Sequence, residues 1–316
     1  MSNKYYFGID LGGTFIKAGV VDQNGNIIAD DKSETKSELG NIAVIDNICT
    51  LFNKVLKDSK IDKSDIVGVG VGAPGLIDTE KGIAIISHNL KFDNFEIASI
   101  LSKKIGLPVK VANDANVATL AETLYGAGKG YNNVVLITLG TGVGGGAVVN
   151  GKLMLGTHGY GAEFGHTVVE YNGRICSCGR RGCLEAYCSA TALIKQTKLA
   201  MKKNKQSKMW QICDINLVDG KTPFNFMQTD LTAKKIIDSY IDYLACGLTN
   251  IANVFRPEVI LLSGGIANQK EGLYDNLNQK LIQQIFGNEN VETIKILPAN
   301  LKNKAGILGA AALFFN

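Results

Sequence analysis

The segment from Gly159 to Glu185 contains residue types that bind metal ions in proteins. It holds one of the chain's three histidines and three of its seven cysteines. The candidate ligands stand in an H-x9-C-x-C-x4-C spacing: His166, Cys176, Cys178 and Cys183. Three thiolates and one imidazole suit tetrahedral zinc, and because protein atoms would fill all four positions, this spacing predicts a structural rather than a catalytic metal. The alternative is a set of reduced cytosolic thiols or a disulfide.

Two carboxylates, Glu163 and Glu185, bracket these four residues. Gly173, Gly179 and Gly182 lie within the segment and allow the backbone to turn tightly. A metal that fixes the segment therefore also fixes two carboxylates and one imidazole, a set that could grip a polyhydroxy ligand.

Two other segments have the pattern strand, glycine turn, strand. In the first, Tyr5–Asp10 and Phe15–Val21 flank Gly12, Gly13 and Thr14. Backbone N–H groups without a neighbouring Cβ, together with the Thr14 hydroxyl, could cradle a phosphate, and Asp10 at the strand end could hold a hydrated magnesium ion. A plain hairpin turn explains this segment equally well.

The second such segment is richer in glycine. Val134–Thr138 and Ala147–Val149 flank Leu139–Gly146, which contains five glycines and a threonine. This density exceeds what a hairpin needs and predicts close approach of the backbone to a phosphate. The segment is not a Walker A loop, because it lacks the G-K-[ST] residues and the strand-to-helix order.

Further candidates follow other predicted strands. Ile66–Val71 leads into a loop that ends at Gly75, and Glu258–Leu262 leads into a third glycine turn at Gly264 and Gly265. A strand ending at Ala112 is followed by Asn113 and Asp114 and then by a helical pattern over 115–125. The positive end of that helix favours an ionised Asp114, although either residue could simply cap the helix.

Length and composition restrict the class of protein. A chain of 316 residues, 46% hydrophobic and 20% charged with a net charge of +4, is long enough for two globular domains. The basic run Lys202–Lys208 lacks interleaved aromatic residues, which favours a solvated helix end over a nucleic-acid site. Neither a signal peptide nor an apolar run of membrane-spanning length is evident, so we expect a cytoplasmic protein.

The helical patterns alternate with the predicted strands, which indicates an α/β protein. They cover 42–56, 95–105, 115–125, 189–203, 231–255, 274–285 and 306–314. This doubled strand and helix layout, combined with two phosphate-type turns and a third glycine turn, resembles the actin/hexokinase-type ATPase fold, with two α/β domains around a central cleft.

More narrowly, the motifs resemble those of the ROK family of bacterial sugar kinases and repressors. They are DLGGT at 10–14, GAPG at 72–75, ND at 113–114, LGTGVGGG at 139–146, EFGH at 163–166, CSCGRRGCLE at 176–185 and SGGI at 263–266. The resemblance implies a smaller domain of residues 1–113 with 302–316. It also implies a larger domain of residues 114–301 that carries the zinc site and the contacts of a homodimer or homotetramer.

The resemblance also implies a role for each matching residue. ATP would be held by Asp10, Gly12, Gly13, Thr14, Lys17, Gly140, Thr141, Gly142, Gly264 and Gly265. The sugar would be held by Gly75, Asn89, Asn113, Asp114, Glu163, His166 and Glu185, with Asp114 as the catalytic base and His166 serving both zinc and sugar. The implied cofactors are ATP, Mg²⁺ and structural Zn²⁺.

Among the activities in this family, the sequence favours a kinase that phosphorylates the 6-hydroxyl of a hexose, glucose first. N-acetylmannosamine and N-acetylglucosamine are the alternative substrates. A repressor would carry a DNA-binding extension, for which DLGGT beginning at residue 10 leaves no room, so we expect no nucleic-acid partner. An inactive sugar-binding regulator is the third alternative.

Overall fold

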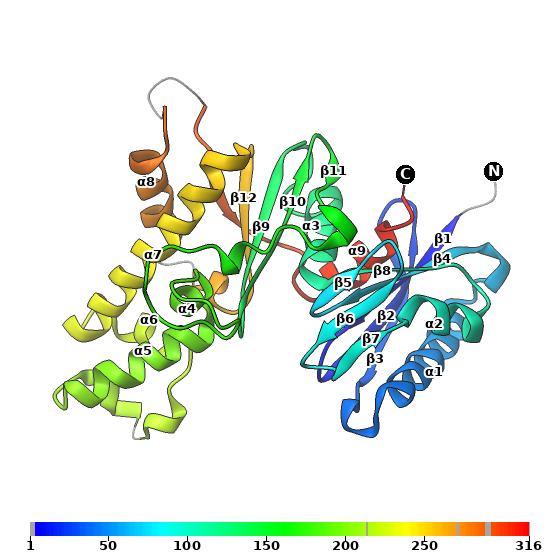
Figure 1. Cartoon of the computed structure of the whole chain (residues 1–316), viewed down its shortest axis with the longest axis horizontal. Coiled ribbons are helices and arrows are strands. Elements are labelled where there is room, and N and C mark those ends of the chain that lie inside the picture. Colours follow the sequence, from blue (N-terminus) through cyan, green and yellow to red (C-terminus); the bar gives the residue numbers. More distant parts are fainter. Residues whose placement is uncertain (1–3, 213, 270–271, 288–291, 316) are drawn as a thin grey trace. The chain divides into compact units, whose positions relative to one another are not determined.

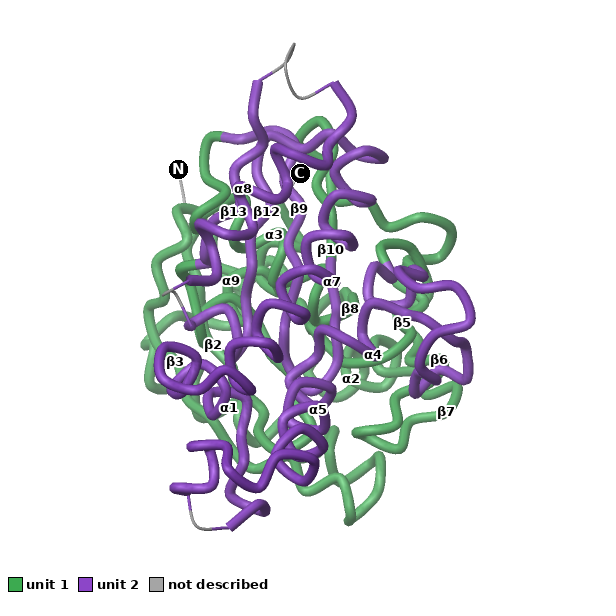
Figure 2. Tube along the Cα trace, turned by 90° about the vertical axis from the view of Figure 1, so that its left-hand side faces the viewer, with its two compact units in different colours: residues 1–130, 146–162, 300–316 green, residues 131–145, 163–299 purple. Residues whose placement is uncertain are grey.

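The computed structural model describes residues 4–212, 214–269, 272–287 and 292–315. The chain divides into two compact units, which Figure 2 colours separately. Unit 1 comprises Met1–Gly130, Gly146–Ala162 and Asn300–Asn316, and unit 2 comprises Tyr131–Gly145 and Glu163–Ala299. The family resemblance predicts a domain boundary after Asn113, whereas this division keeps the next helix in unit 1.

Unit 1 is built on a five-stranded sheet with the order β3-β2-β1-β4-β8 (Figure 1). Its strands are β1 (Tyr5–Leu11), β2 (Phe15–Asp22), β3 (Ile27–Glu34), β4 (Ile66–Ala73) and β8 (Val109–Asn113). Short turns join β1, β2 and β3, which therefore pair antiparallel, whereas β1, β4 and β8 run parallel. Since parallel strands end at one edge of a sheet, the loops that follow β1, β4 and β8 emerge together.

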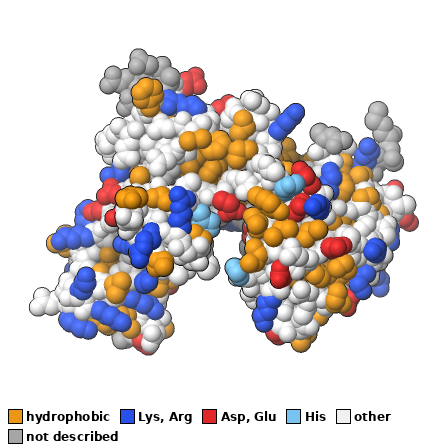
Figure 3. All heavy atoms as spheres, in the orientation of Figure 1, with side chains coloured by type: hydrophobic (Ala, Val, Ile, Leu, Met, Phe, Trp, Pro, Cys, Tyr) orange, Lys and Arg blue, Asp and Glu red, His pale blue; other side chains and the backbone are white. Residues whose placement is uncertain are grey.

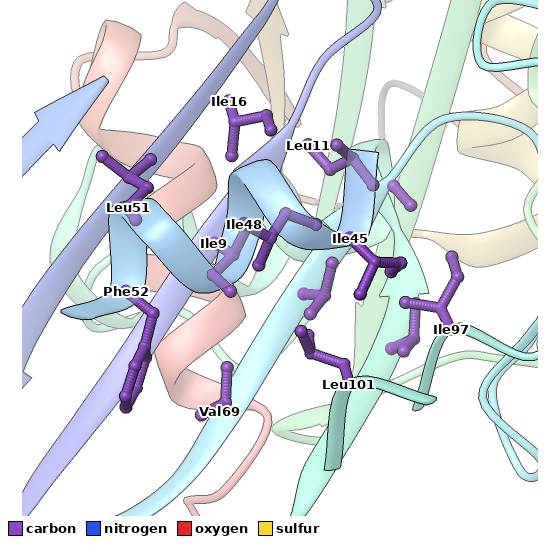
Figure 4. Packing of buried hydrophobic residues seen from close by; sticks show 14 of the residues in the cluster. Ile9, Leu11, Ile16, Ile45, Ile48, Leu51, Phe52, Val69, Ile97 and Leu101 are labelled. Carbon is purple, nitrogen blue, oxygen red and sulfur yellow. The ribbon is translucent and has the colours of Figure 1, made fainter. Parts of the chain in front are cut away.

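Helices α1 (Asn41–Ser59) and α2 (Ile97–Ile105) cover one face of this sheet. The residues that α1 buries recur every three or four positions, as a one-sided helix requires. They are Val44, Ile45, Ile48, Leu51, Phe52 and Val55. Figure 4 shows Ile45 and Ile48 of α1 packed with Ile9 of β1 and Leu101 of α2, which is the centre of the unit 1 core.

Helices α3 (Asp114–Tyr125) and α9 (Ala305–Ala312) pack together on unit 1. The backbone of α9 lies directly on the sheet, because a Cβ on Gly8 would come within 1.9 Å of the Ile307 carbonyl oxygen and one on Gly70 within 1.8 Å of that of Ala310. The Glu122 carboxylate of α3 accepts the N–H groups of Asn300 and Leu301 at 3.0 and 2.7 Å. These contacts explain why α3 belongs to unit 1.

A three-stranded sheet in unit 1 has the order β5-β6-β7. Its strands are β5 (Leu76–Asp78), β6 (Ile83–Ser87) and β7 (Phe92–Phe95). β7 continues to Phe95, so α2 begins two residues later than the predicted helix.

Unit 2 contains most of a second sheet, whose order is β11-β10-β9-β12-β13. The strands are β9 (Val134–Leu139), β10 (Val143–Val149), β11 (Lys152–Leu153), β12 (Val259–Ser263) and β13 (Lys295–Pro298), and the division between the units falls within β10. The helices of unit 2 are α4 (Glu185–Cys188), α5 (Ala190–Lys203), α6 (Thr222–Phe226), α7 (Leu231–Phe255) and α8 (Tyr274–Gln284). Within the described part of the chain, the search for a helix able to cross a membrane finds none.

The glycine-rich segment at 139–146 differs from its prediction. The structure places Gly144, Gly145 and Gly146 inside strand β10, so the turn itself spans only Leu139 to Gly142. A Cβ on Gly145 would meet the Phe164 ring at 2.6 Å, and one on Gly146 would meet the Thr119 hydroxyl at 2.3 Å. The last glycines of the segment therefore serve close packing rather than an exposed phosphate turn.

Candidate functional site

The predicted metal ligands lie together in unit 2. One donor atom from each of His166, Cys176, Cys178 and Cys183 lies within 4.8 Å of the others. The sulfurs of Cys178 and Cys183 are 3.8 Å apart, and His166 Nδ1 is 3.7 Å from the Cys176 sulfur. Zn–S bonds of about 2.3 Å in a tetrahedron place neighbouring ligands ~3.8 Å apart, so the four donors fit a tetrahedral zinc ion. The sulfur separation is far longer than a disulfide bond of about 2.05 Å.

The backbone of this metal cluster, His166 with the three cysteines, is held by short bridges. Isolated β-bridges pair Val168 with Cys183 and Ile175 with Arg181. Gly182 adopts a φ of 81°, and a Cβ there would lie 1.8 Å from the Glu170 carbonyl oxygen. The segment can fold back on itself at this point because glycine has no Cβ to meet the Glu170 carbonyl.

The three thiols of the cluster differ in acidity. The Arg180 N–H donates to Cys178 and lowers the pKa of that thiol. Burial raises the pKa of Cys176 and raises that of Cys183 to about 12. Because metal ligands must be thiolates, an ion that binds here must displace protons from the buried thiols, and binding should tighten as pH rises.

The two carboxylates that bracket the cluster have different surroundings. Glu163 is solvent-exposed, yet desolvation by neighbouring protein raises its pKa, while His166 lowers it and Glu185 raises it further. Glu185 is the first residue of α4 and is engaged through both oxygens. Its Oε1 accepts the Ser177 hydroxyl at 2.6 Å, and its Oε2 accepts the Val143 N–H at 3.0 Å.

The glycine turn of unit 2, Leu139–Gly142, connects β9 to β10 and is held by the chain that follows the metal cluster. The Ala190 N–H donates to the Gly140 carbonyl at 2.8 Å, and the Thr191 hydroxyl donates to the Thr141 carbonyl at 2.8 Å. Thr141 itself is exposed. The turn thus presents an exposed stretch of backbone on a fixed support, which is an arrangement that can receive an anion.

The third predicted glycine turn lies beside it. Strands β12 and β9 run parallel with Ser263 opposite Thr138, so both turns follow the same edge of the sheet. Gly264 has a φ of 93°, and a Cβ there would lie 2.4 Å from the Leu139 carbonyl oxygen. Unit 2 therefore brings together Gly140, Thr141, Gly142, Gly264 and Gly265, as the sequence predicts for one ligand.

The glycine turn of unit 1, Gly12–Thr14, joins β1 to β2. The Thr35 hydroxyl donates to the Gly12 carbonyl at 2.6 Å, and the Thr35 N–H donates to the Thr14 carbonyl at 2.9 Å. Asp10 and Lys17 are opposite each other in the β1–β2 register, and their side chains form an ion pair at 3.2 Å. An exposed turn with a carboxylate and a lysine at its base has the groups needed to contact a phosphate and its metal ion.

Three predicted sugar contacts lie where β4 and β8 end. Ala73 and Asn113 are register partners, which brings Gly75 beside Asn113. The Asn113 side chain donates to the Gly75 carbonyl at 3.0 Å and accepts the N–H groups of Ala115 and Asn116 at 2.9 and 3.3 Å. Asn113 is therefore the N-cap of α3, and Asp114 is the first helical residue, with an exposed side chain.

Asn89, the remaining predicted sugar contact in unit 1, is exposed in the loop after β6. A Cβ on Gly13 would lie 3.3 Å from the Asn89 Cβ, so this loop packs against the glycine turn of unit 1. Close by, Ser87 is 2% exposed, and its hydroxyl has no hydrogen-bond partner among the described residues. The β6 loop therefore offers polar groups next to that turn.

Sequence reasoning missed several residues that hold the site. Thr35 and Thr191 support the two glycine turns, and Ser177 supports Glu185. No local motif marks them. Thr35 and Thr191 contact turns that are distant in sequence, and Ser177 stands between two candidate metal ligands. The sequence also gave no sign of a second group that could hold a metal: Asp78, Glu80 and His158 in unit 1. Hydrogen bonds of this group join the β5–β6 turn to residues 157–159.

The surface of unit 2 is basic around α5. Figure 3 shows Lys and Arg side chains gathered over this helix. The run Lys202–Lys208 begins in its last turn, and the lysines of the run are exposed.

Comparison with known proteins identifies the chain's relatives. The chain is 38% identical to a glucokinase of Thermotoga maritima over 97% of this chain and 96% of the relative. It is 28% identical to a xylose repressor of Bacillus spizizenii over 98% of this chain and 76% of the repressor. A crystal structure of a ROK family glucokinase from Streptomyces griseus with glucose and AMPPNP matches with a TM-score of 0.81 and 32% identity, covering 98% of each chain.

These matches confirm the α/β architecture and the actin/hexokinase-type fold that the sequence predicts. The model of the ROK family matches residues 6–316. The match therefore includes both glycine turns, the metal cluster and the residues at the ends of β4 and β8. The chain belongs to the ROK family.

Proposed function

We propose that the protein is an ATP-dependent hexose kinase that transfers the γ-phosphoryl group of ATP to the 6-hydroxyl of glucose. The observation that carries this proposal is the placement of Asp114. Asp114 is exposed at the start of α3, where its Oδ1 accepts the Ala115 N–H at 2.9 Å, and Asn113 is the N-cap. An exposed carboxylate at the positive end of a helix is suited to accept a proton from a bound hydroxyl. The identity to glucokinases over nearly the whole chain supports the same activity.

In this proposal the two glycine turns bind the phosphates of ATP. The residues of these turns are Gly12, Gly13 and Thr14, and Gly140, Thr141 and Gly142. The N–H groups of Gly13, Thr14, Thr141 and Gly142 stabilise phosphate charge, whereas those of Gly12 and Gly140 donate to the Phe15 and Gly142 carbonyls and hold the turns in shape. Such preorganised donors are the main source of catalysis in phosphoryl transfer. Gly264 and Gly265 contact the adenosine, because their turn follows the same sheet edge as Gly140. Lys17 adds a positive charge, and Asp10 is the residue that would hold Mg²⁺.

The sugar is bound by the polar groups that the family resemblance assigns to it. They are Gly75, Asn89, Asn113, Asp114, Glu163, His166 and Glu185. Asp114 orients the primary hydroxyl and takes its proton as the oxygen attacks. His166 has its Nδ1 among the cysteine sulfurs, so Nε2 is the nitrogen available to the sugar.

Zinc has a structural role in this proposal. His166, Cys176, Cys178 and Cys183 would hold it, and their spacing fits four protein ligands around one ion. When bound, the metal supplies a rigid link between segments that carry Glu163, His166 and Glu185. Mg²⁺, when bound with ATP, supplies charge neutralisation on the phosphates.

The decisive experiment is a coupled assay of ADP release with ATP and a panel of sugars. The panel contains glucose, mannose, N-acetylglucosamine and N-acetylmannosamine, and the readout is kcat/KM for each. We expect glucose to be highest. If the kcat/KM for an N-acetylhexosamine exceeded that for glucose tenfold, the protein would still be a sugar kinase, but its substrate would be the N-acetylhexosamine.

The match to xylose repressors favours one further candidate, a regulator that binds a sugar without phosphorylating it. Calorimetric binding of a sugar with no ADP release for any member of the panel would establish that function instead. Light scattering on the purified protein tests the accompanying proposal, based on family resemblance, that the chain forms a homodimer or homotetramer.

A further inference from the structure

We propose that Ser177 is a positioning residue for nucleotide binding, which acts by holding Glu185 against the Leu139–Gly142 turn. The inference rests on the proposed function, because it takes that turn to be a phosphate-binding turn. It adds that the metal cluster sets the geometry of the nucleotide turn as well as that of the sugar-binding residues. All the groups involved lie in unit 2.

The link consists of two hydrogen bonds through one carboxylate. The Ser177 hydroxyl donates to Glu185 Oε1 at 2.6 Å, and the Val143 N–H donates to Glu185 Oε2 at 3.0 Å. Each oxygen therefore serves a different segment. Hydrogen bonds to an ionised carboxylate are shorter and stronger than neutral ones, and the Ser177 contact is of the short kind.

Glu185 packs directly on the turn. A Cβ on Gly142 would lie 2.4 Å from Glu185 Oε2, so the carboxylate occupies the space that any larger residue would need. The other side of the turn is held by Ala190 and Thr191 at the start of α5. Glu185 thus fixes the end of the turn that enters β10, and a shift of its side chain changes where the turn's N–H groups point.

Ser177 stands between two of the metal ligands, Cys176 and Cys178. A metal bound to both neighbours fixes the position of Ser177, and Ser177 in turn fixes Glu185. The Cys176 sulfur also lies near Glu185 Oε1, at 3.4 Å, but a metal-bound thiolate has no proton to donate to a carboxylate. Ser177 is therefore the principal contact through which the metal cluster reaches the nucleotide turn.

The test compares Ser177→Ala with Ser177→Thr, which retains the hydroxyl. The matched control is Ser99→Ala, which removes a similar exposed Ser to Glu hydrogen bond, 2.7 Å to Glu96, from α2 in unit 1. Calorimetry with Mg²⁺ and AMPPNP gives the nucleotide Kd, and elemental analysis gives the zinc content. We expect about 5–10-fold weaker AMPPNP binding for Ser177→Ala, which corresponds to ~1–1.4 kcal/mol. This is less than the full energy of one hydrogen bond to a charged group, because the bond acts on the turn and not on the nucleotide itself.

Zinc content and Tm should stay at the wild-type values in Ser177→Ala, so that the loss is not one of folding. Ser177→Thr should restore most of the affinity, and Ser99→Ala should not change it. In kinetics the KM for ATP should rise while kcat changes little. If Ser177→Ala binds AMPPNP within twofold of wild type, the inference is overturned while the proposed function stands. If the wild-type protein binds no AMPPNP and releases no ADP with any sugar, the proposed function fails, and the inference fails with it.

A second measurement tests the coupling itself without any turnover. Competition with a chelator gives the zinc affinity with and without AMPPNP. Linkage requires that if zinc favours nucleotide binding, then the nucleotide favours zinc binding by the same factor. We expect AMPPNP to raise zinc affinity several-fold in the wild type and to have a smaller effect in Ser177→Ala. Equal factors in the two proteins would contradict the role of Ser177.

Discussion

The two glycine turns have the same local pattern but different supports. The turn of unit 1, Gly12–Thr14, is held by Thr35, which lies directly after β3 of the same sheet. The turn of unit 2, Leu139–Gly142, is held by Glu185 and by the start of α5, which follow the metal cluster in the chain. One turn is therefore fixed by its own sheet and a neutral hydroxyl. The other is fixed by a carboxylate that contacts a metal-binding loop.

This difference teaches how two similar turns can respond differently to the same change. The support of the unit 1 turn by its sheet depends on the folding of unit 1 and requires no bound metal ion. A support through the metal cluster depends on metal occupancy, because without an ion the four ligand side chains are no longer joined and the segment is held by hydrogen bonds such as its short β-bridges. Changes that remove the metal should loosen the turn of unit 2 and leave the turn of unit 1 unaltered.

The largest effect is expected from Cys178→Ser. Structural zinc in small sites binds with an apparent free energy of roughly 10–16 kcal/mol, comparable to the stability of a whole domain. The variant should lose zinc by elemental analysis and most of its affinity for glucose. Hydrogen exchange should accelerate in residues 139–143 but not in 11–15. Cys246→Ser, the same change at a cysteine of α7 in unit 2, should keep its zinc, and accelerated exchange in both turns would contradict the separation of the supports.

The next largest effect is expected from Asp114→Asn, which changes the chemistry and leaves both turns intact. General-base catalysis is typically worth roughly 10²–10⁴-fold, so kcat should fall by about that factor. Sugar affinity should change far less, since the amide keeps the shape and still forms hydrogen bonds. If Asp114 acted only through the helix terminus, Asn would serve nearly as well and kcat would stay near the wild-type value. Calorimetry and exchange of both turns confirm that the variant is folded.

Sequence patterns predict the strands, the turns and the clustering of His166 with three cysteines well, because each depends on local geometry or compact spacing. They could not assign the cap of α3 to Asn113 rather than Asp114, since both residue types cap helices and both accept the Ala115 N–H. Only the Asn116 bond and the extended backbone of Asn113 decide. Sequence patterns also placed Gly145 and Gly146 in a turn, because the side chains that require glycine there, Phe164 and Thr119, come from other segments.

A smaller effect is expected from Gly264→Ala, which tests the packing of the third glycine turn against Leu139, the first residue of the unit 2 turn. The residue has a φ of 93°, and its Cβ would lie 2.4 Å from the Leu139 carbonyl oxygen, so the backbone must shift. We expect a loss of about 2–4 kcal/mol in unfolding free energy, measured by denaturant titration. Gly265→Ala is the matched control, because its Cβ meets nothing within 4 Å and its φ is −62°. Equal losses in the two variants would show that the contact with Leu139 is not the cause.

The smallest effect is expected from Thr35→Val, which removes the hydroxyl support of the unit 1 turn and preserves the side-chain shape. Thr35 is fully buried, and its hydroxyl bond to the Gly12 carbonyl is short at 2.6 Å. Losing it should cost about 1–2 kcal/mol of unfolding free energy and should raise the KM for ATP a few-fold. The backbone bond from the Thr35 N–H to Thr14 remains, which limits the effect.

Thr35→Ser separates the hydroxyl from the methyl group. Serine keeps the donor to Gly12 and loses one buried methyl, so it should be destabilised by about 1 kcal/mol while its KM for ATP stays near the wild-type value. If the two turns have separate supports, Thr35→Val should also raise the rate of hydrogen exchange in residues 11–15 and not in residues 139–143. Its zinc affinity should not change. A Thr35→Val protein whose zinc affinity fell with its ATP affinity would mean that the two turns share a support, because a sheet-held turn has no reason to respond to the metal cluster.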